Sequence, residues 1–116
     1  MARFSGAPDR RVFPRFQAEV PLVVSVVGEQ EIASLRAHAD GISEGGLSLR
    51  GVEGMRVGQT VSLEMYLPNA TQPIWLEAMV RHEGGHYGLQ FQSLSDAQKK
   101  LIKRYCRLQP REKRRA

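Results

Sequence analysis

Polar and hydrophobic residues alternate through most of the middle of the chain, as they do in β-strands with one buried face. The clearest run is 60–67, where Val61, Leu63, Met65 and Leu67 share one face. Five further runs have the same alternation or are rich in β-branched residues, and they cover residues 18–27, 31–39, 46–50, 74–82 and 86–91. Six short strands separated by turn residues predict a mainly β fold, a six-stranded antiparallel β-barrel.

The period changes at Ser95, where the pattern predicts a helix. Ser95 and Gln98 have the spacing of a capping box, with Ser95 as the N-cap residue. Apolar residues then recur on one helical face, namely Ala97, Leu101, Ile102, Tyr105 and Leu108. Pro110 ends the helix. We expect this C-terminal helix to pack on the barrel by its apolar face.

The composition of the 116 residues is that of one soluble globular domain, with 41% hydrophobic and 25% charged residues. The single cysteine, Cys106, excludes an internal disulfide, which suits a reducing compartment. We expect it to be a small buried or half-buried residue. No apolar run approaches the roughly 20 residues that span a membrane, and the first ten residues lack a signal sequence. These features predict a cytoplasmic protein without a membrane span.

The net charge of +5 is unevenly distributed. Residues 1–15 and 99–116 are strongly basic, and Glu112 is the one acidic residue of the second stretch. Residues 16–98 carry ten carboxylates against four arginines. A domain that grips a duplex along its body would be basic there, so we expect no DNA binding. The basic ends instead suggest anion-binding arms.

One segment has the formal pattern of a zinc protease, His82-Glu83-Gly84-Gly85-His86. That chemistry needs both histidines on one face of a helix, whereas two glycines strongly disfavour a helix here. The flanking runs are strand-like, so a β-hairpin explains the glycines better. Because no other nucleophile, metal-ligand cluster or phosphate loop is present, we expect no enzyme activity, no catalytic residues, no metal site and no cofactor.

Two other segments carry residue types suited to ligand binding. Arg10, Arg11 and Arg15 surround Pro14 just before the first strand, where the chain should be extended. The segment 40–46 (DGISEGG) is a small polar loop whose glycines let backbone N–H groups approach a ligand. Each segment alone also fits an ordinary role, as a solvated basic tail and a β-turn respectively.

Together the two segments resemble the motifs of the PilZ domain family, bacterial receptors for cyclic di-GMP. Arg11 and Arg15 match R-x-x-x-R, Arg10 completes the common double arginine, and Ser43 and Gly46 match the family's [DN]-x-S-x-x-G loop. The resemblance covers nearly the whole chain and implies a six-stranded barrel with a packed C-terminal helix. It assigns guanine and phosphate contacts to the arginines, and it implies that Ser43, Gly45 and Gly46 hold the ligand from the barrel side.

The chain departs from the motif at Gly41, where the family has Asp or Asn. Asp40 lies one residue early, and in a regular strand that offset turns its carboxylate to the opposite face. In a loop, Gly41 gives the chain freedom to recover the contact, and Asp40 then accepts from a guanine edge. The sequence leaves both orientations of the Asp40 carboxylate open. The motif predicts that Gly41→Asp tightens binding of cyclic di-GMP. Trp75 and Arg81 are weaker candidates for a ligand-facing or partner-facing wall.

The expected organisation is a flexible arm over 1–16, the barrel and helix over 17–109, and a disordered basic tail over 110–116. An arm that orders on binding cyclic di-GMP exposes or hides a surface for an unidentified effector protein. Two alternatives remain: a PilZ domain that has lost its nucleotide and acts by protein contact, and a small barrel that binds RNA or single-stranded DNA.

Overall fold

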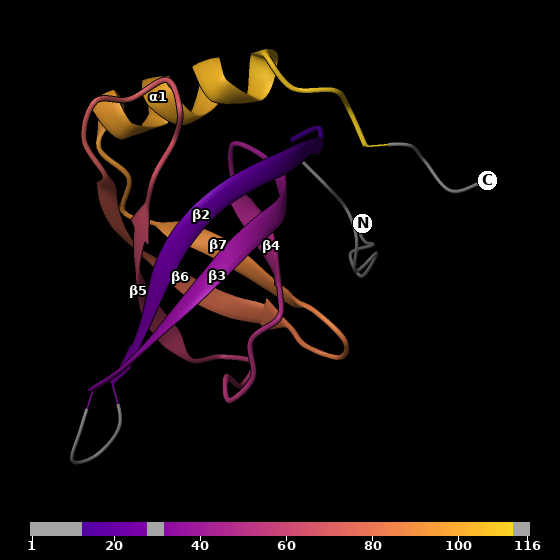
Figure 1. Cartoon of the computed structure of the whole chain (residues 1–116), viewed down its shortest axis with the longest axis vertical. Helices are drawn as coiled ribbons and strands as arrows, with labels where there is room; N and C mark the ends of the chain where they lie inside the picture. Colours follow the sequence, from indigo (N-terminus) through magenta and orange to yellow (C-terminus); the bar gives the residue numbers. More distant parts are fainter. Residues whose placement is uncertain (1–12, 28–31, 113–116) are drawn as a thin grey trace, which may run out of the picture.

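The computed structural model describes residues 13–27 and 32–112, which form six strands and one helix. The strands are β2 (Phe16–Val27), β3 (Ile32–Ile42), β4 (Gly46–Arg50), β5 (Thr60–Met65), β6 (Ile74–His82) and β7 (Tyr87–Gln92). All neighbours are antiparallel and follow the order β2-β3-β4-β7-β6-β5, with β2 pairing with β5 to close the barrel. The predicted six-stranded antiparallel barrel is confirmed (Figure 1).

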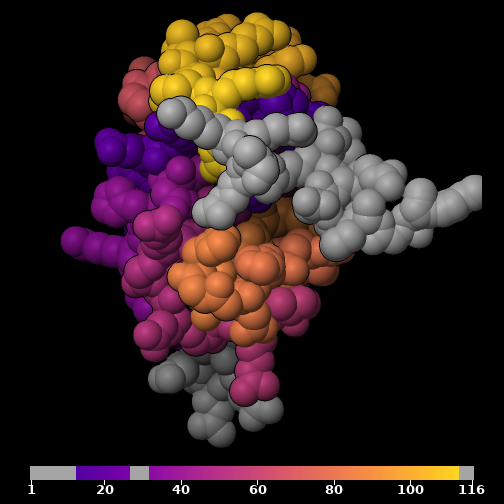
Figure 2. Space-filling model, turned by 90° about the vertical axis from the view of Figure 1, so that its right-hand side faces the viewer, coloured from indigo at the N-terminus to yellow at the C-terminus, as the bar shows by residue number. Residues whose placement is uncertain are grey.

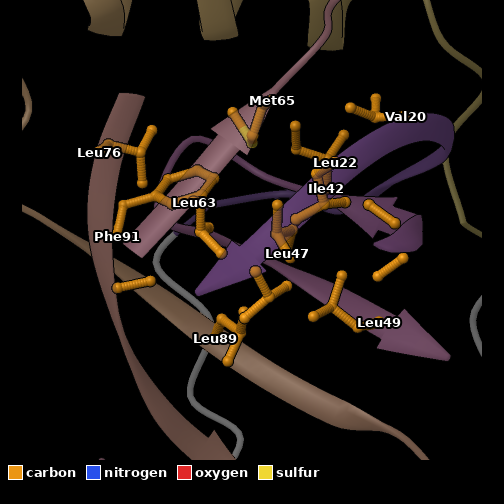
Figure 3. Packing of buried hydrophobic residues seen from close by; sticks show 14 of the residues in the cluster. Val20, Leu22, Ile42, Leu47, Leu49, Leu63, Met65, Leu76, Leu89 and Phe91 are labelled. Carbon is orange, nitrogen blue, oxygen red and sulfur yellow. The ribbon is translucent and has the colours of Figure 1, made fainter. Parts of the chain in front are cut away.

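The interior of the barrel is filled by the apolar faces that the alternation predicted. Val61, Leu63 and Met65 of β5 are buried, and so are the inward residues of β6, Ile74, Leu76, Ala78 and Val80. Figure 3 shows side chains from several strands meeting in this core, among them Leu22, Ile42, Leu47 and Leu89. Truncating one such leucine to alanine in a closed core costs about 2–5 kcal/mol.

Helix α1 (Asp96–Arg107) lies across one end of the barrel (Figure 1). The capping box is confirmed, because Ser95 Oγ accepts from the Gln98 backbone and Gln98 Oε1 accepts from the Ser95 backbone. The helix buries Ile102, Tyr105 and Cys106. Two residues of the predicted apolar face differ: Ala97 in the first turn and Leu108 at the C-cap are exposed. Both lie at the ends of the helix, beyond its buried middle.

The end of β3 differs from the expected loop, because the strand continues through Asp40 and Gly41 to Ile42. The register between β3 and β4 shifts there: Ala39 pairs with Leu49, but Gly41 pairs with Ser48. Asp40 is therefore an extra, bulged residue. Only residues 43–45 remain as the connection to β4.

The segment after the helix forms regular contacts with the first strand. Gln17 N donates to the Pro110 carbonyl, and Glu112 N donates to the Arg15 carbonyl. Phe16 and Arg111 are paired between these two bonds. Residues 110–112 of the predicted tail thus flank the start of β2, and residues 113–116 lie outside the described part. No helix in that part is long and apolar enough to cross a membrane.

Candidate functional site

The connection between β3 and β4 is held by the Ser43 hydroxyl. Ser43 Oγ accepts from Gly45 N at 3.1 Å and lies 3.4 Å from the Gly46 carbonyl, to which it donates. The backbone closes the same turn through Ser43 N and the Gly46 carbonyl, 2.8 Å apart. The Gly45 carbonyl accepts from Phe91 N, so the turn is also attached to β7. Ser43 therefore fixes the shape of this turn.

Both glycines of this turn are closely packed, and at Gly46 the packing excludes any side chain. A Cβ on Gly46 would overlap the Leu89 carbonyl oxygen of β7. A Cβ on Gly45 would stand 3.1 Å from a ring carbon of Phe13. The loop pattern suggested that these glycines admit a ligand to the backbone, whereas in the structure they admit a neighbouring strand and an aromatic ring.

An open pocket of about 220 Å³ lies beside this turn. Four of the principal predicted residues line it together: Arg15, Ser43, Gly45 and Gly46. Its other lining residues are Phe13, Leu47, Arg81, His82, Gly88, Leu89 and Gln90. Figure 2 looks onto the side of the molecule where the β6–β7 hairpin is exposed below the helix. Arg10 and Arg11 lie outside the described residues.

The charge of the pocket is suited to an anion. Arg15, Arg81 and His82 contribute the basic groups of its lining, and none of the described residues that line it carries a carboxylate. Among residues 13–27 and 32–112, Asp40 and Arg50 form the one ion pair. Arg15 and Arg81 thus have no carboxylate partner in this part of the chain, and their guanidinium groups are suited to bidentate contact with phosphate or a base edge.

Asp40 does not line this pocket. Because Asp40 is bulged, its side chain and that of Ser48 meet on the outer face: Ser48 Oγ donates to Asp40 Oδ1 at 2.6 Å. Asp40 Oδ2 lies 2.7 Å from Arg50 Nε. The bulge resolves the question that the sequence left open about its orientation, since Asp40 faces outward but is engaged by two neighbours.

Small residues cross the outer face of the barrel in one row. Gly41 of β3 pairs with Ser48 of β4, Ser48 pairs with Gly88 of β7, and Gly88 pairs with His82 of β6. Leu47 and Leu49 flank Ser48 and point into the core, so Ser48 and its partners belong to the outer face. Gly41 and Ser48 are buried in this row, whereas Gly88 and His82 line the pocket.

The remaining candidates separate into two places. Arg81, a weaker sequence-based candidate for a ligand-facing wall, lines the pocket with Arg15. Trp75 lies elsewhere, between two other hollows on β5–β6 and beside α1, and its side chain is 65% exposed. Its carbonyl accepts from Gln98 Nε2 of the helix. The structure does not bring Trp75 to the arginine pocket.

The histidines of the protease-like pattern lie on a hairpin, as the glycines predicted. His82 ends β6, while Gly84 and Gly85 have φ of +117° and +88° in the turn. The two imidazole rings are 5.2 Å apart, and Glu83 accepts from Val57 N. The described part of the chain holds no cluster of three or more metal-ligating side chains. His82 instead contributes to the pocket wall.

Sequence reasoning did not single out Phe13, Gln90 and Gly88 as pocket residues. Phe13 offered a weak signal, as an aromatic inside the arginine-rich segment. Gln90 and Gly88 offered none, because alternation places them on the outer face but only the register of β7 against β4 and β6 brings them beside the pocket. Their assignment needs the tertiary structure.

The fold and the pocket define a small barrel module suited to binding an anionic ligand beside its N-terminal segment. A family model described as the PilZ domain matches residues 9–108. The chain belongs to the PilZ domain family. Among curated proteins, none matches the chain in sequence.

Solved structures share this fold. The Bacillus subtilis inhibitor of motility, MotI/DgrA, aligns with a TM-score of 0.68 and 21% identity over 86% of this chain and 50% of that chain. The PilZ domain of Escherichia coli YcgR with c-di-GMP has a TM-score of 0.65 and 14% identity over 87% and 92%. The PilZ domain of CeSA from a cellulose synthesizing bacterium aligns with a TM-score of 0.58 and 17% identity over 79% of this chain and 93% of that chain. The chain thus spans about half of MotI/DgrA.

Proposed function

We propose that this chain is a receptor for cyclic di-GMP that acts by binding, without turnover, and passes its signal to a partner protein. The observation that carries the proposal is the single pocket that Arg15, Ser43, Gly45 and Gly46 line together. The solved YcgR domain in complex with c-di-GMP shares the fold and supports the choice of ligand.

The chemistry of the pocket fits the two parts of this ligand. Guanine presents O6 and N7 as an acceptor pair that matches the fork of an arginine. Phosphate oxygens accept from arginine in the same bidentate way. We assign these contacts to Arg15 and to Arg10 and Arg11 of the preceding segment, with Arg81 of β6 as a further basic group in the pocket lining. Ser43, Gly45 and Gly46 form the barrel side of the site.

The proposed output is a change in the segment that precedes β2. Arg15 follows Phe13 and Pro14 directly, so a ligand that engages Arg15 also fixes this segment against the Gly45 turn. Ordering a segment on binding creates or hides a surface for a partner. The partner is a protein that distinguishes the two states of this segment.

Calorimetric titration of the purified chain with cyclic di-GMP tests the proposal. We expect saturable binding, and we expect Arg15→Ala to weaken it by about ten- to a hundredfold, the loss for a hydrogen bond to a charged group. Arg36→Ala is the matched control, because Arg36 is an exposed arginine of β3 that does not line the pocket.

Three results would contradict the proposal. The absence of cyclic di-GMP binding by the parent chain favours the alternative that this PilZ domain no longer binds a nucleotide and acts by protein contact. Equal weakening by Arg15→Ala and Arg36→Ala indicates general charge attraction. Salt-sensitive binding of oligonucleotides without binding of cyclic di-GMP favours the nucleic-acid alternative.

A further inference from the structure

The carboxylate of Glu112 lies against Gly41, although the two residues belong to opposite ends of the chain. Glu112 Oε2 stands 2.5 Å from the position that a Cβ on Gly41 would take. Ser48 Oγ is 2.8 Å from the same position. The absence of a side chain at Gly41 is therefore what leaves room for the Glu112 carboxylate.

The backbone of Glu112 is held by the segment that carries Arg15. Glu112 N donates to the Arg15 carbonyl at 3.0 Å, and the neighbouring Arg111 pairs with Phe16. Glu112 thus stands beside Arg15 in this short ladder, while its carboxylate reaches β3. Gly41 in turn belongs to the outer row that leads through Ser48 to Gly88 of the pocket.

Two carboxylates lie on this part of the outer face, and they differ in their partners. Asp40 is engaged by Ser48 and Arg50. Glu112 has no ion-pair or side-chain hydrogen-bond partner among residues 13–27 and 32–112. Both oxygens of Asp40 already accept from neighbouring side chains, whereas the bonds of Glu112 in this part of the chain are to its backbone alone.

We propose that Glu112 is a specificity-determining residue of the ligand site, which accepts hydrogen bonds from the N1–H and N2–H₂ edge of a guanine. This inference rests on the proposed function. Guanine offers two adjacent donors on that edge, which match the two oxygens of one carboxylate. Adenine places a lone pair at N1, which a carboxylate repels. Glu112 therefore favours guanine both by attraction and by rejecting adenine.

The proposal also accounts for the departure from the family motif at Gly41. The family motif has its acceptor side chain at position 41. In this chain Glu112 of the C-terminal segment supplies a carboxylate at the same place. A side chain at 41 and the Glu112 carboxylate cannot both keep their present places: the Cβ would stand 2.5 Å from Oε2, so the end of the Glu112 side chain has to move away. The expectation that Gly41→Asp tightens binding is therefore replaced: in the parent chain this change should weaken binding.

The first test compares the parent chain, Glu112→Ala and Glu112→Gln in titrations with cyclic di-GMP and cyclic di-AMP. We expect both variants to bind cyclic di-GMP about tenfold more weakly, the loss of a charge-assisted bond. We expect their preference for cyclic di-GMP over cyclic di-AMP to shrink by a similar factor. Glu77→Gln is the matched control, because Glu77 is an exposed carboxylate of β6 that does not line the pocket.

The second test supplies the carboxylate acceptor from position 41 instead of from Glu112. Gly41→Asp should weaken binding in the parent but recover part of the lost affinity in the Glu112→Ala background, because the carboxylate is gone and only the Ser48 hydroxyl, 2.8 Å from the Cβ position, has to shift. Thermal unfolding of each variant establishes that it is folded. Recovery of the preference for guanine in the double variant would show that both residues serve one position.

The results separate the two proposals. A parent chain that binds no cyclic di-GMP overturns the proposed function and the role of Glu112 with it. A parent that binds, with Glu112→Ala binding equally or more tightly and with the same base preference, overturns the role of Glu112 alone. Tighter binding by that variant would mean that the carboxylate occupies space that the ligand needs.

Discussion

The ring of Phe13 lies on the backbone of Gly45, with its nearest carbon 3.1 Å from the position of a Cβ at Gly45. This contact joins the segment before β2 to the turn that Ser43 shapes. Both residues line the pocket with Arg15, which follows Phe13 by two positions. The pocket wall thus depends on a close approach that an alanine at Gly45 would disturb.

We predict that Gly45→Ala weakens cyclic di-GMP binding by about three- to tenfold, because the added methyl displaces the Phe13 ring and with it Arg15. Calorimetry checks the affinity. The same substitution in a Phe13→Ala background should cost much less, since the ring is already absent. Equal losses in the two backgrounds would show that the contact does not position Arg15.

We predict that Ser43→Ala reduces ligand affinity about tenfold, and that Asp40→Ala reduces it less than threefold. Ser43 holds the turn through two hydrogen bonds, whereas Asp40 is engaged by Ser48 and Arg50 outside the pocket. Asp40→Ala should instead lower stability by about 1 kcal/mol, mainly because the buried Ser48 hydroxyl loses its acceptor. Titration and thermal unfolding of both variants measure this. A larger affinity loss for Asp40→Ala than for Ser43→Ala would show that Asp40, and not Ser43, is the more important residue for ligand binding.

We predict that cyclic di-GMP slows amide hydrogen exchange across residues 6–16. The proposed contacts of the arginines link this segment to the barrel, and slower exchange is the expected sign of such ordering. Exchange measured by mass spectrometry with and without ligand tests it, with β5 as an internal reference. Unchanged exchange in a chain that binds the ligand would mean that the site is preformed and that the output lies elsewhere.

We predict that Cys106 is almost unreactive in the native protein. The side chain is 1% exposed, and burial, with a smaller contribution from the Glu44 carboxylate, raises the pKa of the Cys106 thiol to about 11. At pH 8 only about one thiol in a thousand would be ionised. Native chain should react with a thiol reagent far more slowly than chain unfolded in urea. Similar rates in the two states would contradict the buried position.

The same raised pKa gives the direction of a stability change with pH. The folded state disfavours the thiolate, so its contribution to stability is complete below the ordinary pKa near 9 and is lost as the pH rises toward 11. Urea unfolding at pH 8 and pH 10 should therefore show lower stability at the higher pH. A Cys106→Ala variant, which lacks the thiol, should show a smaller decrease.

The sequence predicted those parts of the molecule that depend on neighbours along the chain. Val61, Leu63 and Met65 face the core because alternation places every second side chain on one side of a strand. Ser95 and Gln98 form their capping box because their spacing alone brings both partners together. The hairpin glycines follow from the same local reasoning.

Part of the candidate site also followed from the sequence, because its motif residues are fixed in type. Arg15, Ser43, Gly45 and Gly46 were expected to act together and do line one pocket. The role of the glycines was not expected, since their need for space comes from Leu89 and Phe13, which lie far away in sequence. Distant packing partners leave no local pattern from which to infer them.

The relationships that distinguish this chain were decided by the tertiary structure alone. The face that Asp40 presents depends on a bulge, which exists only where β3 is paired with its neighbours. The meeting of Glu112 with Gly41 depends on where α1 ends and on the pairing of the following segment with β2. The sequence by itself determined the strands, the helix cap and the motif residues, because these follow from short-range spacing. The placement of Glu112 against Gly41 required the closed barrel, since only its geometry brings the end of the chain to that point.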